Sequence, residues 1–83
     1  MGSIKRGGVR FSAYPNDHLP RHVHAYVGEV MVILELIDQD VRLANRVDQM
    51  RPNNGKRSDV KKALRVAAKH FEELVELWEG RNG

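Results

Sequence analysis

The stretch HVHAYVGEVMVILELI, residues 22–37, decides the fold, because it contains two strand-like segments separated by a short turn. In its first part, residues 22–27, apolar side chains alternate with histidine or tyrosine, which is the period of a strand with one buried face. Residues 30–37 are nearly all apolar and rich in branched side chains, as in a strand contacted on both faces. Gly28 begins the turn between them, so the stretch predicts an antiparallel hairpin.

Two more strands are expected on either side of the hairpin. Residues 9–14 alternate apolar and polar side chains, and residues 41–46 do the same with more polar character, which suits an edge strand. Residues 15–20 contain two prolines with an Asn-Asp pair and predict a loop, and residues 50–57 predict a second irregular loop. The sheet therefore has about four strands.

The C-terminal third has the pattern of one amphipathic helix. Ser58 is placed as its N-cap and Gly80 as the glycine that ends it. Apolar residues recur between them at three- and four-residue spacing: Val60, Ala63, Leu64, Ala67, Phe71, Leu74, Val75 and Trp78. Together with the strands, this helix predicts a small α+β domain in which the helix covers one face of an antiparallel sheet.

The composition of the chain excludes several classes of protein. The chain has 83 residues, no cysteine and a formal net charge of +3, so disulfide scaffolds and thiolate metal sites are excluded. We expect a single domain over residues 1–83, with residues 1–8 as a disordered tail or a remnant of cloning. No apolar run approaches the ~20 residues that span a bilayer, which favours a cytoplasmic protein without a membrane partner.

Three of the four histidines lie between residues 18 and 24. His22 and His24 share one face of the predicted strand, about 6.6 Å apart by the strand rise, so two imidazoles there can bind one metal ion. His18 on the preceding loop is a candidate third ligand, and Asp17 a fourth ligand or a carboxylate that orients a histidine. This set predicts a divalent transition metal, although its spacing matches no defined metal signature.

The same histidines support two other interpretations. As acid and base they could act on RNA, with Arg21 or Arg10 stabilising the charge of a scissile phosphate. Alternatively they order the loop through hydrogen bonds or contact a partner chain, and have no chemical role. The sequence leaves open whether the protein is an enzyme, and which metal or substrate it would use.

A basic tract precedes and enters the predicted helix. It is a candidate surface for nucleic acid or for an acidic partner, and it consists of Arg51, Lys56, Arg57, Lys61, Lys62, Arg65 and Lys69. Residues 30–37 also leave Met31, Ile33 and Ile37 on the sheet face away from the helix. An apolar strip of this kind is typical of an interface, so we expect a homodimer or a complex with a cognate partner.

Three segments resemble a known bacterial family, the domain of unknown function 4160. They are NDHLPRHVHAYV at residues 16–27, the apolar strand at 30–37 and HFEELVELWEG at 70–80, so the resemblance runs from about Val9 to Gly80. Its most specific residues are Asp17, His18, Pro20, His22 and His24. Family members usually have a second proline where this chain has Arg21. The resemblance implies a small gene beside toxin–antitoxin partners and brings no established activity.

The expected function is that of a small bacterial interaction protein of toxin–antitoxin type. The far sheet face and the basic helix are expected to engage the partner. The alternatives are a histidine- or metal-dependent enzyme acting on RNA, and a nucleic-acid-binding module that uses the basic helix. The sequence does not distinguish a toxin from an antitoxin, nor does it decide the oligomeric state.

Overall fold

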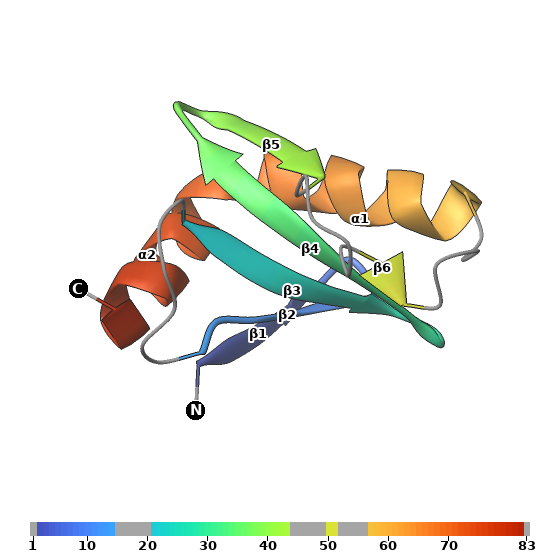
Figure 1. Ribbon diagram of the computed structural model, residues 1–83, viewed down its shortest axis with the longest axis horizontal. Helices are drawn as coiled ribbons and strands as arrows, with labels where there is room; N and C mark the ends of the chain where they lie inside the picture. Colours follow the sequence, from blue (N-terminus) through green and yellow to red (C-terminus); the bar gives the residue numbers. More distant parts are fainter. Residues whose placement is uncertain (1, 15–20, 44–49, 52–56, 83) are drawn as a thin grey trace.

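A computed structural model describes residues 2–14, 21–43, 50–51 and 57–82 of the chain (Figure 1). These residues form an antiparallel sheet and two helices. In chain order the elements are β1 (Ser3–Arg6), β2 (Val9–Ser12), β3 (His22–Val27), β4 (Val30–Ile37), β5 (Asp40–Leu43), β6 (Met50–Arg51), α1 (Arg57–Lys69) and α2 (Phe71–Asn82). The fold is a small α+β fold, as the sequence predicts.

The sheet has the strand order β1-β2-β3-β4-β5, and each strand pairs antiparallel with the next. The two-residue β6 also pairs with β4, through Met31 and Val32. The predicted hairpin is β3 and β4, and its register aligns Val27 with Val30 around the turn at Gly28, where φ is 58°. Five strands therefore lie along the sheet where the sequence predicts about four.

The additional strand is β1, and it corrects the expectation of a disordered tail at residues 1–8. Ser3–Arg6 pairs with β2, and Ile4 lies opposite Phe11. Gly7 and Gly8 make the turn between the strands with φ of 55° and 81°, a conformation that glycine adopts without steric cost. Because Ile4 also packs against the core, β1 is an integral edge strand.

Two helices stand where the sequence predicts one. The main-chain N–H of His70 donates to the carbonyl of Ala67 at 3.2 Å and to that of Val66 at 3.1 Å, which tightens the end of α1. The N–H of Leu74 then donates to the carbonyl of His70 at 3.1 Å as α2 begins. The predicted stop at Gly80 is wrong, because α2 continues through Gly80 to Asn82.

Other predicted boundaries shift by a few residues. β5 covers Asp40–Leu43, and the rest of the strand expected at residues 41–46 lies outside the described residues. The loop expected at residues 50–57 begins instead with β6, and α1 starts at Arg57, one residue before the expected N-cap Ser58. Residues 15–20 and 52–56 also lie outside the described part, so the loops predicted there stay predictions.

The core fills the space between one sheet face and the two helices. Val23, Ala25 and Val27 on β3 are buried in it, as their alternation predicts. From the helices the core takes Val60, Ala63, Val66, Ala67, Leu74 and Trp78. The rest of the predicted apolar stripe, Leu64, Phe71 and Val75, is partly buried against this core. Both helices therefore cover the same face of the sheet.

The turn between β4 and β5 has an unusual backbone. Asp38 has φ of 57° and Gln39 has φ of 141°, and neither is a glycine. Non-glycine residues in such conformations cost of order 1–3 kcal/mol each. The turn stands beside α2, where it borders a groove. Among the described residues, no helix has the length and apolar character that crossing a membrane requires.

Candidate functional site

The far face of the sheet is the side opposite α1 and α2. The strand register arranges its side chains in rows across β2, β3 and β4, with Arg10 beside Tyr26 and Tyr26 beside Met31. A second row runs from Ser12 through His24 to Ile33. Ile33 is only 1% exposed although it lies outside the core under the helices. The far face therefore contains both a buried apolar centre and polar or aromatic side chains around it.

Four side chains of this face form what we call the tyrosine cluster, namely Arg10, Tyr14, His24 and Tyr26. The guanidinium carbon of Arg10 lies 4.2 Å from the centroid of the Tyr26 ring, a cation–π arrangement. The hydroxyl oxygens of Tyr14 and Tyr26 share a hydrogen bond at 2.8 Å. The His24 ring meets the Tyr14 ring edge to face, with centroids 4.7 Å apart. Each ring is thus positioned by a neighbour.

The Tyr26 hydroxyl is neutral at physiological pH, as a phenol ordinarily is, and its environment favours the neutral form further. Burial raises the pKa of this phenol above its usual 10.0, and the hydrogen bond with Tyr14 adds to the rise, while the charge of Arg10 opposes it. The hydroxyl is therefore available both to donate and to accept a hydrogen bond. A phenol with one apolar body and one polar end is suited to recognising another protein surface.

The histidine pair of β3 lies next to the tyrosine cluster. The His22 and His24 rings have centroids 6.0 Å apart and are tilted by 43°, and the His22 residue is only 6% exposed. Glu35 on β4 lies opposite His22 in the register. The structure thus places both histidines on the face away from the helices, as predicted. The other two predicted metal ligands, Asp17 and His18, lie outside the described residues.

The described residues do not by themselves make a metal centre. They contain no group of three or more histidine, cysteine or acidic side chains arranged to hold a metal ion. Structural zinc is normally bound by four protein ligands and catalytic zinc by three. The pair His22 and His24 would therefore need further ligands, and the metal site stays a prediction.

The structure does not bring Arg21 to the histidine pair. Its Nε atom lies 3.7 Å from an Oε1 of Glu79 on α2, so the side chain extends toward the helices. Its main-chain carbonyl accepts a hydrogen bond from the N–H of Leu36 at 2.8 Å. Adjacent positions of an extended chain point to opposite faces, which explains why Arg21 and His22 separate. Arg10, the other candidate cation, does lie on the histidine side.

The basic tract becomes a ridge along α1. Arg57, Lys61, Arg65 and Lys69 are exposed at four-residue intervals, and Lys62 is half-buried beside them. Within the described chain, no ion pair neutralises these five side chains. Arg51 belongs to β6, its side chain is not described, and Lys56 lies outside the described residues. The ridge is on the helix layer, so the sheet separates it from the tyrosine cluster.

Comparison with known protein families shows to which family the chain belongs. A family model described as Domain of unknown function (DUF4160) matches residues 8–79. The chain belongs to this family. The DUF4160 match begins just before β2 and ends within α2, so it includes the tyrosine cluster, the histidine pair and the α1 ridge. Comparisons with curated proteins and with solved structures found no match.

β1 lies before the first residue of the DUF4160 match. One of its side chains takes part in a polar cluster that was not predicted from the sequence. Arg6 on β1 donates to Glu73 on α2, with its Nη2 atom 2.8 Å from Oε2. The Nδ1 atom of His70 lies 2.6 Å from Oε1 of the same carboxylate. The i, i+3 spacing of His70 and Glu73 could have indicated one contact. Nothing local indicated Arg6, which is 67 residues away.

We expect the cluster of Arg6, His70 and Glu73 to make the stability of this chain depend on pH. Hydrogen bonds from Arg6 and then from His70 lower the pKa of Glu73 below its usual 4.5. A carboxyl with a lower pKa in the folded state contributes stability above its unfolded pKa and loses it as pH falls through the folded value. We therefore expect wild type to exceed Glu73→Gln in stability at neutral pH. This difference should shrink as pH falls below about 4.5.

Urea unfolding at a series of pH values measures this difference. The matched control is Glu72→Gln, which removes an adjacent exposed carboxylate without an ion pair among the described residues. A difference between wild type and Glu73→Gln that stays constant from neutral to acid pH would contradict the assignment. So would an equal pH-dependent difference in the Glu72→Gln control.

Proposed function

We propose that this chain is a small interaction protein of toxin–antitoxin type, which binds a protein partner through the far face of its sheet. The observation that carries the proposal is the tyrosine cluster on a face that neither described helix covers. Tyrosine and arginine are the residue types enriched at the energetic centres of interfaces. Tyr14 is also the exposed large hydrophobic side chain of the described residues, at 42%.

The structure of the cluster supports recognition by a protein. Arg10 lies on the Tyr26 ring, and Tyr14 is fixed by both Tyr26 and His24. Side chains that are already ordered lose less conformational entropy when a partner binds. Met31, which is half-buried, continues the surface from the cluster across β4, and Ile33 beside it is buried under this face. Such a combination of ordered aromatic anchors and adjacent apolar side chains is suited to a protein surface.

The distribution of charge favours a protein partner over nucleic acid. The far face carries Arg10 and Arg42, but also Glu35 and Asp40 on the neighbouring strands, and Arg42 pairs with Asp40 at 3.4 Å. A nucleic-acid surface needs a predominance of positive charge near its stacking rings. Here the basic ridge of α1 lies on the opposite side of the sheet, so one strand of nucleic acid cannot contact the ridge and the tyrosine cluster together.

Co-expression with the product of the adjacent gene tests the proposal. We expect the two proteins to purify together as a complex of fixed stoichiometry, which light scattering after size exclusion measures. Self-association of the 9.5-kDa chain alone would instead give a homodimer through the same face. If the chain stays monomeric alone and binds nothing in co-expression, the proposal is wrong.

A second candidate function is a histidine- or metal-dependent enzyme acting on RNA, and the His22 and His24 pair favours it. The two rings are 6.0 Å apart on the face that also carries Arg10. With metal–nitrogen bonds of about 2.0–2.1 Å, two imidazoles near this separation can share one metal ion. Glu35 lies opposite His22 in the register, where a carboxylate would orient the ring, but the three side chains are not arranged to hold a metal ion.

The metal content of the purified, untagged protein separates the two functions. The interaction proposal expects well under one equivalent of transition metal by elemental mass spectrometry. The control is a His22→Ala/His24→Ala variant whose thermal stability equals that of wild type. About one equivalent in wild type and none in this variant would favour the enzyme. Metal found equally in both proteins would show that the pair does not hold it.

A further inference from the structure

A groove separates α2 from the turn between β4 and β5. We call it the α2 groove, and its volume is about 740 Å³. Volumes of this order accommodate a ligand of several side chains. Both helices pack on the face opposite the tyrosine cluster, so the α2 groove is distinct from the far face. All the residues that line it belong to the described part of the chain.

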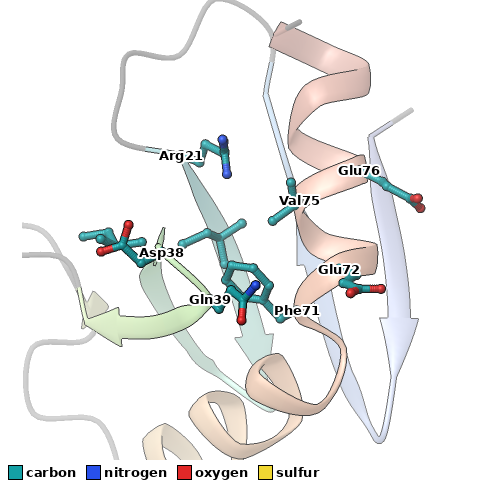
Figure 2. Close-up of a pocket in the computed structure, with 9 residues that line it drawn as sticks. Arg21, Asp38, Gln39, Phe71, Glu72, Val75 and Glu76 are labelled. Carbon is teal, nitrogen blue, oxygen red and sulfur yellow. The ribbon is translucent and has the colours of Figure 1, made fainter.

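The centre of the groove is apolar. Phe71 and Val75 line it from α2, and Leu36 and Ile37 line it from the end of β4. Figure 2 shows Phe71 and Val75 on the side of α2 that faces Arg21 and Gln39. Phe71 and Val75 are only partly buried against the core, so an apolar side chain placed in the groove would remove more of their surface from water.

The edge of the groove is acidic. Asp38, Glu72 and Glu76 line it, and all three are exposed. The one basic side chain of the lining, Arg21, is already close to a fourth carboxylate, that of Glu79. In Figure 2 the carboxylates of Glu72 and Glu76 point outward from α2. In this view both carboxylates point away from Phe71 and Val75, so the negative charge lies along the outer edge of the groove, and a complementary ligand has positive charge beyond its apolar group.

We propose that the α2 groove docks a short basic peptide segment, in which leucine-like side chains enter the centre and flanking lysines or arginines meet Glu72, Glu76 and Asp38. We choose a basic peptide as the occupant because its positive charges complement the acidic edge of the groove. The backbone at the groove also fits a binding role, because Asp38 and Gln39 hold positive φ values there. Strained non-glycine residues of this kind are concentrated at ligand-binding segments.

Binding of a defined peptide tests the proposal. The probe is a fluorescein-labelled peptide with two leucines between pairs of lysines, titrated with the full chain while fluorescence anisotropy is recorded. We expect saturable binding that weakens as salt rises. Glu72→Lys/Glu76→Lys should weaken it about tenfold, because two attractions become repulsions. The control Glu29→Lys reverses an exposed charge in the β3–β4 turn and should leave the affinity unchanged.

Three results would overturn the proposal. The first is no saturable binding up to about millimolar peptide, the weak limit of specific affinity. The second is equal binding of a matched peptide with glutamates in place of the lysines. The third is self-association of wild type, detected by ultracentrifugation, that Glu72→Lys/Glu76→Lys abolishes. In that case a second copy of the chain, using its basic α1 ridge, occupies the groove.

Discussion

Replacing Tyr26 by alanine is expected to weaken binding of the protein partner by about thirtyfold or more, the effect of losing an interface residue worth 2 kcal/mol. The ring supports the guanidinium of Arg10, and its hydroxyl holds that of Tyr14. The substitution therefore removes one side chain and releases two others. Isothermal titration of the adjacent gene's product with wild type and with Tyr26→Ala measures the loss.

Tyr26→Phe is the matched control for this prediction. It keeps the ring under Arg10 and removes only the hydroxyl that bonds Tyr14. We expect it to lose only about 0.5–1.5 kcal/mol of binding free energy, the usual contribution of one hydrogen bond. Equal affinities for wild type and Tyr26→Ala would exclude the tyrosine cluster from the interface. Urea unfolding of each variant would confirm that the fold is retained.

Replacing Phe11 by alanine is expected to lower the free energy of unfolding by about 3–5 kcal/mol. Phe11 is fully buried on β2, between Ile4 of β1 and Ala25 of β3 in the register, and it belongs to the core under the helices. The variant loses the burial of the ring and leaves a cavity that its neighbours fill only in part. Since native domains have about 5–15 kcal/mol of stability, this loss is a large fraction of the total.

Two comparisons make the Phe11→Ala measurement specific. Phe11→Leu retains most of the buried volume and should cost less than about 1.5 kcal/mol. Tyr14→Ala removes a larger but exposed aromatic residue from the other face and should also cost much less than Phe11→Ala. A loss below about 1 kcal/mol for Phe11→Ala would contradict the assignment of the core to the helix side of the sheet.

The sequence was sufficient to predict the sheet faces because strand alternation is a local property. Val23 and Ala25 are buried under the helices, and His22 and His24 lie on the far face, as the period of two requires. The nearly continuous apolar run of β4 correctly indicated a strand with both faces contacted, since Ile33 and Leu34 are both buried. The apolar stripe of the helices could also be predicted from the sequence, because helical periodicity is likewise a local property.

The remaining features depend on contacts between distant residues or on small energy differences. β1 has a short polar sequence, and only its pairing with β2 and the packing of Ile4 show that it is a strand. The break at His70 interrupts a stripe that continues in register from α1 to α2, so periodicity predicts no break there. Gly80 has the usual character of a helix end, but two further residues of α2 follow it.

The candidate site was predicted in part. The shared face of His22 and His24 followed from alternation, whereas the proximity of Tyr14 to both Tyr26 and His24 depends on the register between β2 and β3. That register cannot be read from either strand alone, because it depends on the loop between them. Arg21 was associated with the histidines through adjacency in sequence, although alternation places neighbouring side chains on opposite faces.

The measurement that tests the central claim most directly is a paired titration of the adjacent gene's product with Tyr26→Ala and with Lys61→Glu/Arg65→Glu. These variants change the far face and the α1 ridge respectively, and the sheet lies between the two surfaces. We predict that Tyr26→Ala loses about thirtyfold in affinity or more, while Lys61→Glu/Arg65→Glu binds as wild type does. Loss of binding in Lys61→Glu/Arg65→Glu with unchanged affinity in Tyr26→Ala would contradict the account and place the interface on α1.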